Sequence, residues 1–153
     1  MNIEITNQKS QIAVALKQEN VTMEGISVLA TEGFQKIFEF LVQQGIEIAG
    51  VPYLAYANGN ADFSEFDVEL GIPVSEEVAV IGEFFMSKNC EGKAITAIHK
   101  GAYKDVEAVY TALMGYMAEN KLESTGVYYD YYINNPADVP ESELLTKVVF
   151  PIK

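Results

Sequence analysis

Two stretches of the chain share one pattern: residues 50–56 read GVPYLAY, and residues 126–132 read GVYYDYY. The second follows the first at a shift of 76 positions (50 to 126). The same shift carries Phe34 onto Tyr110, and Pro73 matches Pro151 at a shift of 78 (73 to 151). Agreement at nearly constant spacing argues against chance similarity. It predicts a duplication with halves at about residues 10–76 and 80–153.

Each half reads as strand, helix, strand, strand. The first half has an expected strand at 11–18, a helix at 31–44 with Thr31 as its N-cap, and strands near 52–57 and 65–73, joined through residues 57–62. The second half has a strand at 93–100, a helix at 104–120, and strands near 127–133 and 144–150. A further strand is expected between the halves at 83–87, and residues 21–30 fit either a loop or a short helix.

This order predicts an α+β fold with an antiparallel sheet and two main helices. Each half is too small to bury its own apolar face, so we expect one pseudo-symmetric domain over residues 1–153. Ligand pockets favour interfaces between structural units, and a pocket between the halves is therefore expected. The aromatic helix residues are expected mostly in the core: Phe34, Phe38, Phe40, Tyr110 and Tyr116.

Composition restricts the class of protein. The chain has 153 residues, 49% of them hydrophobic, which is typical of a globular protein. Its net charge of −12 opposes binding to nucleic acid, which depends on clustered Lys and Arg, and it suits attraction of cationic small molecules. Solubility alone is the alternative explanation. The sequence shows neither an apolar run long enough to span a bilayer nor a signal peptide, so a cytoplasmic location is expected.

Side chains suited to catalysis or metal binding are few. The one cysteine, Cys90, lies in an expected turn and has only one histidine in the chain to activate it, so we expect no nucleophilic role. One His and one Cys also make a metal site improbable, and no Gly-rich phosphate loop is present, so no cofactor is expected.

The strand around Asp130 carries an acid between tyrosines. Alternation places Tyr128, Asp130 and Tyr132 on one face, and Tyr129, Tyr131 and Ile133 on the other. Because one face must cover the helices, and an unpaired acid is costly there, we expect the Asp130 face to lie away from them and to line a pocket. A solvated Asp on an edge strand is the alternative. For Glu69 and Asp67, a solvated strand face is favoured.

Several stretches together resemble the GyrI-like small-molecule-binding family, the effector-binding domain of some bacterial transcription regulators. They are Gly50 with Pro52 and Tyr56, residues 67–74 (DVELGIPV), residues 99–103 (HKGAY), and residues 130–136 (DYYINNP), followed by Val139-Pro140 and by Thr146 with Pro151. The resemblance runs from about residue 10 to the end. It implies two strand–helix–strand–strand modules with a ligand pocket between them.

The resemblance also implies a site for drug-like, often cationic compounds. Family members place a buried acid, usually Glu, six residues before a proline, and the matching residue here is the shorter Asp130. Asn135 stands where the family usually has Asp. Tyr103 matches a family pocket position, and Tyr56 is the repeat partner of Tyr132. His99 is more often structural in such a place, and ordinary packing remains open for Tyr103 and Tyr56.

Two functions follow as hypotheses. The first is a stand-alone module that binds or senses a cationic or amphipathic small molecule through Asp130, Tyr132, Tyr128, Tyr103, Tyr56 and His99. About ten residues precede the first expected strand, too few for a DNA-binding unit, so regulation of transcription would need a partner chain. Inhibition of a protein target such as DNA gyrase is a variant. The alternative is a GyrI-like hydrolase of cyclopropanoid or other electrophilic compounds, with Asp130 as the acid and Tyr103 as its partner.

Overall fold

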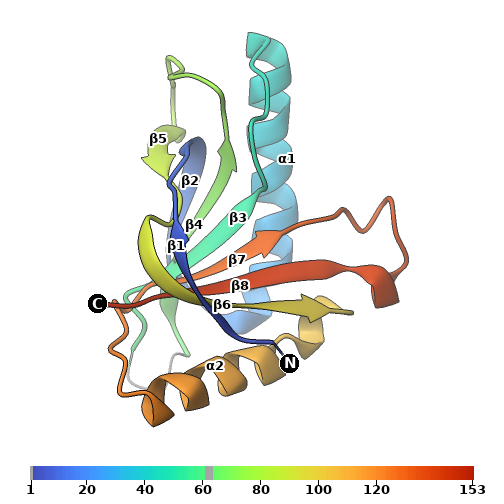
Figure 1. The fold of residues 1–153 in the computed structure, drawn as a ribbon. Coiled ribbons are helices and arrows are strands. Elements are labelled where there is room, and N and C mark those ends of the chain that lie inside the picture. Colours follow the sequence, from blue (N-terminus) through green and yellow to red (C-terminus); the bar gives the residue numbers. More distant parts are fainter. Residues whose placement is uncertain (1, 61–63) are drawn as a thin grey trace. The chain divides into compact units, whose positions relative to one another are not determined.

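The computed structural model describes residues 2–60 and 64–153 (Figure 1). The chain forms two compact units. We name Ser10–Asn89 the N-terminal unit, and Met1–Lys9 with Cys90–Lys153 the C-terminal unit. Part of the segment expected to join two strands, residues 61–63, lies outside the described residues.

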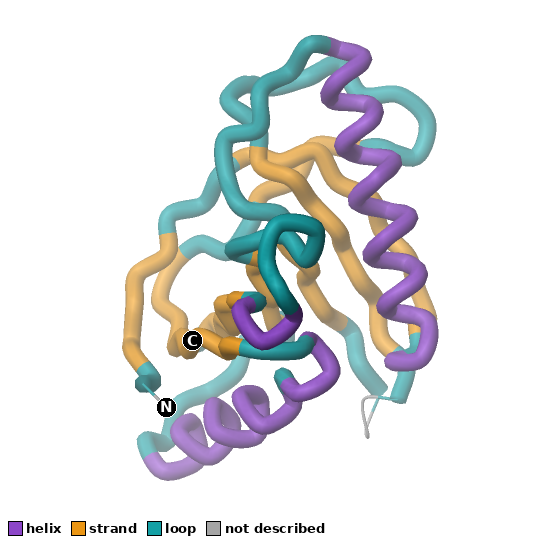
Figure 2. The backbone as a smooth tube through the Cα atoms, turned by 90° about the vertical axis from the view of Figure 1, so that its right-hand side faces the viewer, coloured by secondary structure: helices purple, strands orange, loops and turns teal. Residues whose placement is uncertain are grey.

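The N-terminal unit holds β2 (Ile12–Val21), the short 3-10 helix η1 (Met23–Gly25), α1 (Ile26–Gln44), β3 (Tyr53–Ala57), β4 (Phe66–Pro73) and β5 (Phe85–Lys88). Its strands lie in the order β3-β4-β2-β5, and each pair is antiparallel. Figure 2 shows α1 running alongside these strands. Gly33 allows α1 to approach β4 closely, because a Cβ at position 33 would lie only 2.8 Å from Leu70 Cδ2.

The C-terminal unit holds β1 (Glu4–Gln8), β6 (Gly92–Lys100), η2 (Tyr103–Asp105), α2 (Glu107–Glu119), β7 (Tyr128–Tyr132), η3 (Glu141–Glu143) and β8 (Leu145–Pro151). Its strands lie in the order β1-β6-β8-β7, again antiparallel. One face of this sheet is covered by α2, whose Val109, Leu113 and Met117 pack against Ile95, Val148 and Phe150. The predicted α+β class with two main helices is confirmed.

The two units have the same internal topology. β2, α1, β3 and β4 follow one another as β6, α2, β7 and β8 do, and they pair in the same order. Each helix ends with the same bond, from Ile46 N to Leu41 O and from Leu122 N to Met117 O, both at 2.9 Å. Each bond follows a residue of positive φ, Gly45 (67°) or Lys121 (54°). These matches fall at the shift of 76 residues that the sequence gives.

Three sequence predictions need correction. The helix of the first half begins at Ile26 rather than at 31, and Thr31 is no N-cap, since its hydroxyl donates to the carbonyl of Ser27. The first strand of the chain is β1, ahead of the predicted one, and it pairs with β6. Phe38 is 51% exposed and therefore lies outside the core that holds Phe40.

In the part of the chain that the structure describes, no helix is long and apolar enough to cross a membrane.

Candidate functional site

Asp130 lies on the face of the C-terminal sheet that α2 covers. It stands opposite Val148, a residue of the core beneath α2, and it is only 4% exposed. The Tyr110 hydroxyl of α2 donates a hydrogen bond to its Oδ1. The expectation that the Asp130 face points away from the helices was therefore wrong. The Tyr110 hydroxyl lowers the free-energy cost of burying Asp130 on that face, because it gives the carboxylate a hydrogen-bond donor.

Tyr110 is a further candidate for the site, and the sequence had assigned it to the core. The repeat offered a signal for it. Tyr110 corresponds to Phe34 in the N-terminal unit, and Asp130 corresponds to Leu54, which is 1% exposed. The C-terminal unit thus has a hydroxyl and a carboxylate on the two elements where the N-terminal unit has two apolar side chains.

Aromatic rings lie on the same side of the sheet as this polar pair. The ring of Tyr128 lies 4.6 Å from that of Phe150, and the ring of Tyr110 lies 5.5 Å from it (centroid distances). The Tyr128 hydroxyl accepts a hydrogen bond from Ser124 Oγ at 3.2 Å. Tyrosine faces are electron-rich and attract cations, so a carboxylate among them forms a site of negative potential.

Tyr103 and Tyr132 form a second aromatic pair on the same face. Their ring centroids lie 5.2 Å apart in an edge-to-face arrangement, with Tyr103 in η2 and Tyr132 at the end of β7. Tyr103 is 36% exposed, and burial of the remainder raises the pKa of its hydroxyl. The hydroxyl therefore keeps its proton at neutral pH and is available as a donor.

His99 has a structural partner. Its Nε2 lies 2.8 Å from the carbonyl oxygen of Ala102. Because a carbonyl oxygen only accepts, Nε2 carries the hydrogen, and the ring holds the turn between β6 and η2. This contact favours the structural interpretation of His99.

Thr146 is a second residue that sequence reasoning did not assign to the site. It is 1% exposed and stands opposite both Tyr132 and His99 across the neighbouring strands. Five residues that the sequence singled out, Asp130, Tyr132, Tyr128, Tyr103 and His99, therefore share the α2 side of the C-terminal unit.

Tyr56 belongs to the N-terminal unit. It stands opposite Val68 on the side of the sheet that faces α1, and its ring meets that of Phe66 edge-on at 5.4 Å. At 7% exposure it is part of the core of that unit. This environment fits the packing alternative for Tyr56.

The other face of β7 carries Tyr129 and Tyr131, stacked at 5.9 Å. Lys147 Nζ lies 5.7 Å from the centroid of the Tyr131 ring, and the Tyr131 hydroxyl accepts a hydrogen bond from Cys90 N at 3.1 Å.

Burial raises the pKa of the Cys90 thiol to about 11. The nucleophilic thiolate is therefore disfavoured at neutral pH.

Glu69 was expected to be solvated, and it is instead part of a polar cluster in the N-terminal unit. Its Oε2 accepts from the hydroxyls of Tyr53 and Ser87, each at 2.8 Å. Tyr53 is fully buried, and its ring lies over Gly71, where any Cβ would collide with it. The cluster thus links β3, β4 and β5.

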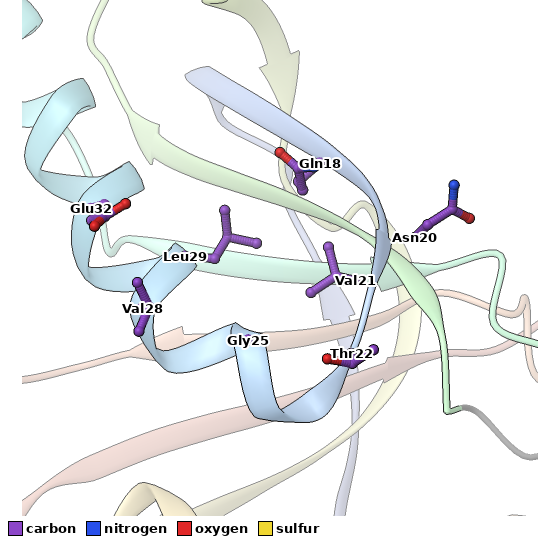
Figure 3. A pocket seen from close by; sticks show the side chains of 8 residues that line it. All are labelled: Gln18, Asn20, Val21, Thr22, Gly25, Val28, Leu29 and Glu32. Atoms are coloured by element: carbon purple, nitrogen blue, oxygen red, sulfur yellow. The ribbon is translucent and has the colours of Figure 1, made fainter.

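A groove of about 390 Å³ lies between the end of β2 and the start of α1 (Figure 3). Leu29 and Val21 point toward one another across it, and Gln18, Thr22 and Glu32 are among its polar lining residues. The corresponding segment of the C-terminal unit, between β6 and α2, contains His99 and Tyr103.

Within residues 2–60 and 64–153, no group of three His, Cys, Asp or Glu side chains is placed to hold a metal ion.

A family model described as the GyrI-like small molecule binding domain matches residues 1–153. The chain belongs to the GyrI-like family. The resemblance seen in its motifs is thereby confirmed. No curated protein matches this GyrI-like chain.

Solved structures share the fold of this GyrI-like chain at low sequence identity. EcmrR in a DNA complex superposes with a TM-score of 0.85 at 18% identity, over 99% of this chain and 57% of that one. The C-terminal domain of EcmrR alone gives 0.81 at 17% identity, over 99% and 97%. The chain thus spans little more than half of the EcmrR chain in the DNA complex and nearly all of the EcmrR C-terminal domain.

Two further structures with this fold are those of a ligand-bound protein and of a hydrolase. SAV2435 bound to tetraphenylphosphonium gives a TM-score of 0.68 at 13% identity, over 100% of this chain and 94% of that one. A hydrolase from Listeria innocua gives 0.67 at 11% identity, over 99% and 91%. At these identities the likeness establishes the fold of this GyrI-like chain.

Proposed function

We propose that the chain binds small molecules that combine a positive charge with aromatic or aliphatic groups, on the α2 side of the C-terminal unit. The observation that carries this proposal is the buried Asp130 carboxylate, which is bonded to the Tyr110 hydroxyl and shares its face of β7 with Tyr128 and Tyr132. A carboxylate attracts a cation by charge, and the rings of Tyr128 and Tyr132 add cation–π and apolar contact. The partly exposed Tyr103 marks the edge from which a ligand enters.

The family supports this proposal, because its model is that of a small-molecule-binding domain. SAV2435 binds tetraphenylphosphonium, a lipophilic cation, on the same fold. EcmrR, a DNA-bound protein, carries a similar domain at its C-terminus, so binding of several drugs and a role in transcription regulation are part of the proposal.

Titration with tetraphenylphosphonium tests the role of Asp130. In Asp130→Asn the shape is kept and the charge is lost, so affinity should fall by about 1–3 kcal/mol, the scale of a charge-assisted hydrogen bond or contact. Neutral triphenylphosphine oxide should lose much less. Asp138→Asn, the same change at an exposed loop position, is the matched control and should bind as wild type does. Equal affinities of wild type and Asp130→Asn for the cation would refute the proposal.

Hydrolysis of an electrophilic compound is the second candidate function. The Tyr110–Asp130 hydrogen bond favours it, because a carboxylate and a phenol in contact can pass a proton to or from a reacting atom. In this role Asp130 is the acid, with Tyr110 or Tyr103 as its partner. Incubation with an electrophilic cyclopropane compound distinguishes the two functions: product formation supports the enzyme, and saturable binding without product supports the binding module.

A further inference from the structure

Thr146 carries a buried hydroxyl that has no hydrogen-bond partner among the described residues. The residue is 1% exposed. A hydroxyl offers one donor and two acceptor positions, and buried polar groups in native proteins are nearly always paired. An orphaned hydroxyl therefore requires an explanation.

The nearest cross-strand residues are engaged elsewhere. His99 and Tyr132 stand opposite Thr146 on β6 and β7 and share its face of the sheet. His99 Nε2 donates to Ala102 O, and the Tyr132 ring meets that of Tyr103. The Thr146 hydroxyl thus lies in the cross-strand row that ends at the Tyr103–Tyr132 pair.

Packing alone does not require a threonine here. In the N-terminal unit the matching residue is Val68, which stands opposite Tyr56 as Thr146 stands opposite Tyr132. Valine has nearly the same shape as threonine without the hydroxyl, and Val68 is fully buried. The same place in the same topology therefore accepts an apolar side chain.

On the α2 side, three polar side chains replace apolar side chains of the N-terminal unit, and Thr146 is the third of them. Tyr110, Asp130 and Thr146 stand where the N-terminal unit has Phe34, Leu54 and Val68. Tyr110 and Asp130 bond to each other. Asp130 is opposite Val148, so Thr146 is its diagonal neighbour, at about 7–8 Å.

We infer that Thr146 is a ligand-binding residue that selects cationic compounds bearing a hydroxyl or carbonyl group about 7–8 Å from the charge. This inference rests on the proposed function and names its ligand class more closely. Asp130 meets the charge, the Tyr103–Tyr132 pair covers the apolar part, and Thr146 Oγ1 meets the polar group. A site built to hydrogen-bond a substrate hydroxyl discriminates strongly against the analogue that lacks it.

Two probes of nearly equal shape test the inference: (5-hydroxypentyl)triphenylphosphonium, whose extended chain can place the hydroxyl at that distance from the phosphonium charge, and hexyltriphenylphosphonium. Wild type should bind the hydroxyl compound about tenfold more tightly than the hexyl compound. Thr146→Val should remove that preference and leave binding of the hexyl compound unaffected. Thr96→Val, a buried threonine on the opposite face of β6, is the matched control and should keep the preference.

Thermal unfolding without ligand gives an independent measurement. Because the hydroxyl is unpaired in the free protein, Thr146→Val should melt at the same temperature as wild type or above it. A clear fall in melting temperature would mean that the hydroxyl already has a partner, and would overturn the inference. Equal binding of both probes by wild type would also overturn it while leaving the proposed function intact. Failure of wild type to bind either probe would remove the proposed function and this inference together.

Discussion

At the scale of single residues, burial decides which side chains are chemically available. Asp130 and Thr146 are both buried, and where water is excluded a polar atom that meets a partner interacts with it strongly. Cys90 is also buried, but its environment acts against reactivity, since desolvation holds the pKa of its thiol near 11. Burial thus strengthens the interactions open to Asp130 and Thr146, and it makes the Cys90 thiol unreactive.

Cys90 should be inert to alkylation and should influence stability only at high pH. Iodoacetamide at pH 8 should modify the native protein far more slowly than the urea-unfolded protein. The folded pKa, about 11, lies above the ordinary value of 9.0, so the protonated thiol stabilises the fold below pH 9, and that contribution disappears as pH rises through 11. Between pH 8.5 and 11, wild type should therefore lose roughly 1 kcal/mol more stability than Cys90→Ala. Identical pH profiles, measured by urea unfolding, would contradict this.

At the scale of elements, the ends of the two helices show what the repeat preserves. Both α1 and α2 close with a residue of positive φ followed by a bond back to the last turn. The N-terminal unit uses Gly45 for this position, whereas the C-terminal unit uses Lys121. A side chain in the left-handed region is strained by contact between its Cβ and the backbone, and glycine is not.

Lys121→Gly should therefore stabilise the protein by about 0.5–1 kcal/mol, because relief of left-handed strain outweighs the added freedom of the unfolded chain. Chemical unfolding of the variant and of wild type measures the difference. Lys104→Gly, a change of the same residue type within η2, is the control and should give no gain. A loss of stability in Lys121→Gly would show that the lysine side chain, rather than the backbone conformation, matters at this turn.

At the scale of the whole molecule, the two units are not consecutive segments of the sequence. The first strand, β1, pairs with β6 and belongs to the C-terminal unit, although the N-terminal unit follows it in sequence. β1 covers the edge of β6, which would otherwise present unpaired backbone groups.

Removal of residues 2–9 should weaken the C-terminal unit selectively. Amide hydrogen exchange in β6 should accelerate by more than tenfold, whereas β4 of the N-terminal unit should keep its protection. Mass spectrometry of exchanged peptides provides the measurement, with β4 as the internal reference. Equal acceleration in both strands would indicate that β1 stabilises the molecule as a whole.

The sequence by itself determined the repeated order of elements, the α+β class and the family. Those features depend on local spacing: the apolar positions of the helices, the Gly-Val pairs and the prolines recur at nearly constant shift. It also indicated Asp130 and four of the side chains that share its face. Only the tertiary structure decided which face that is, because alternation along a strand divides residues into two sets without saying which set meets the helix. The acid proved to lie under α2 because Tyr110, twenty positions away, supplies the hydroxyl that makes its burial tolerable. The unpaired state of Thr146 likewise depends on where His99 and Tyr132 direct their own contacts, and no local pattern in the sequence records that.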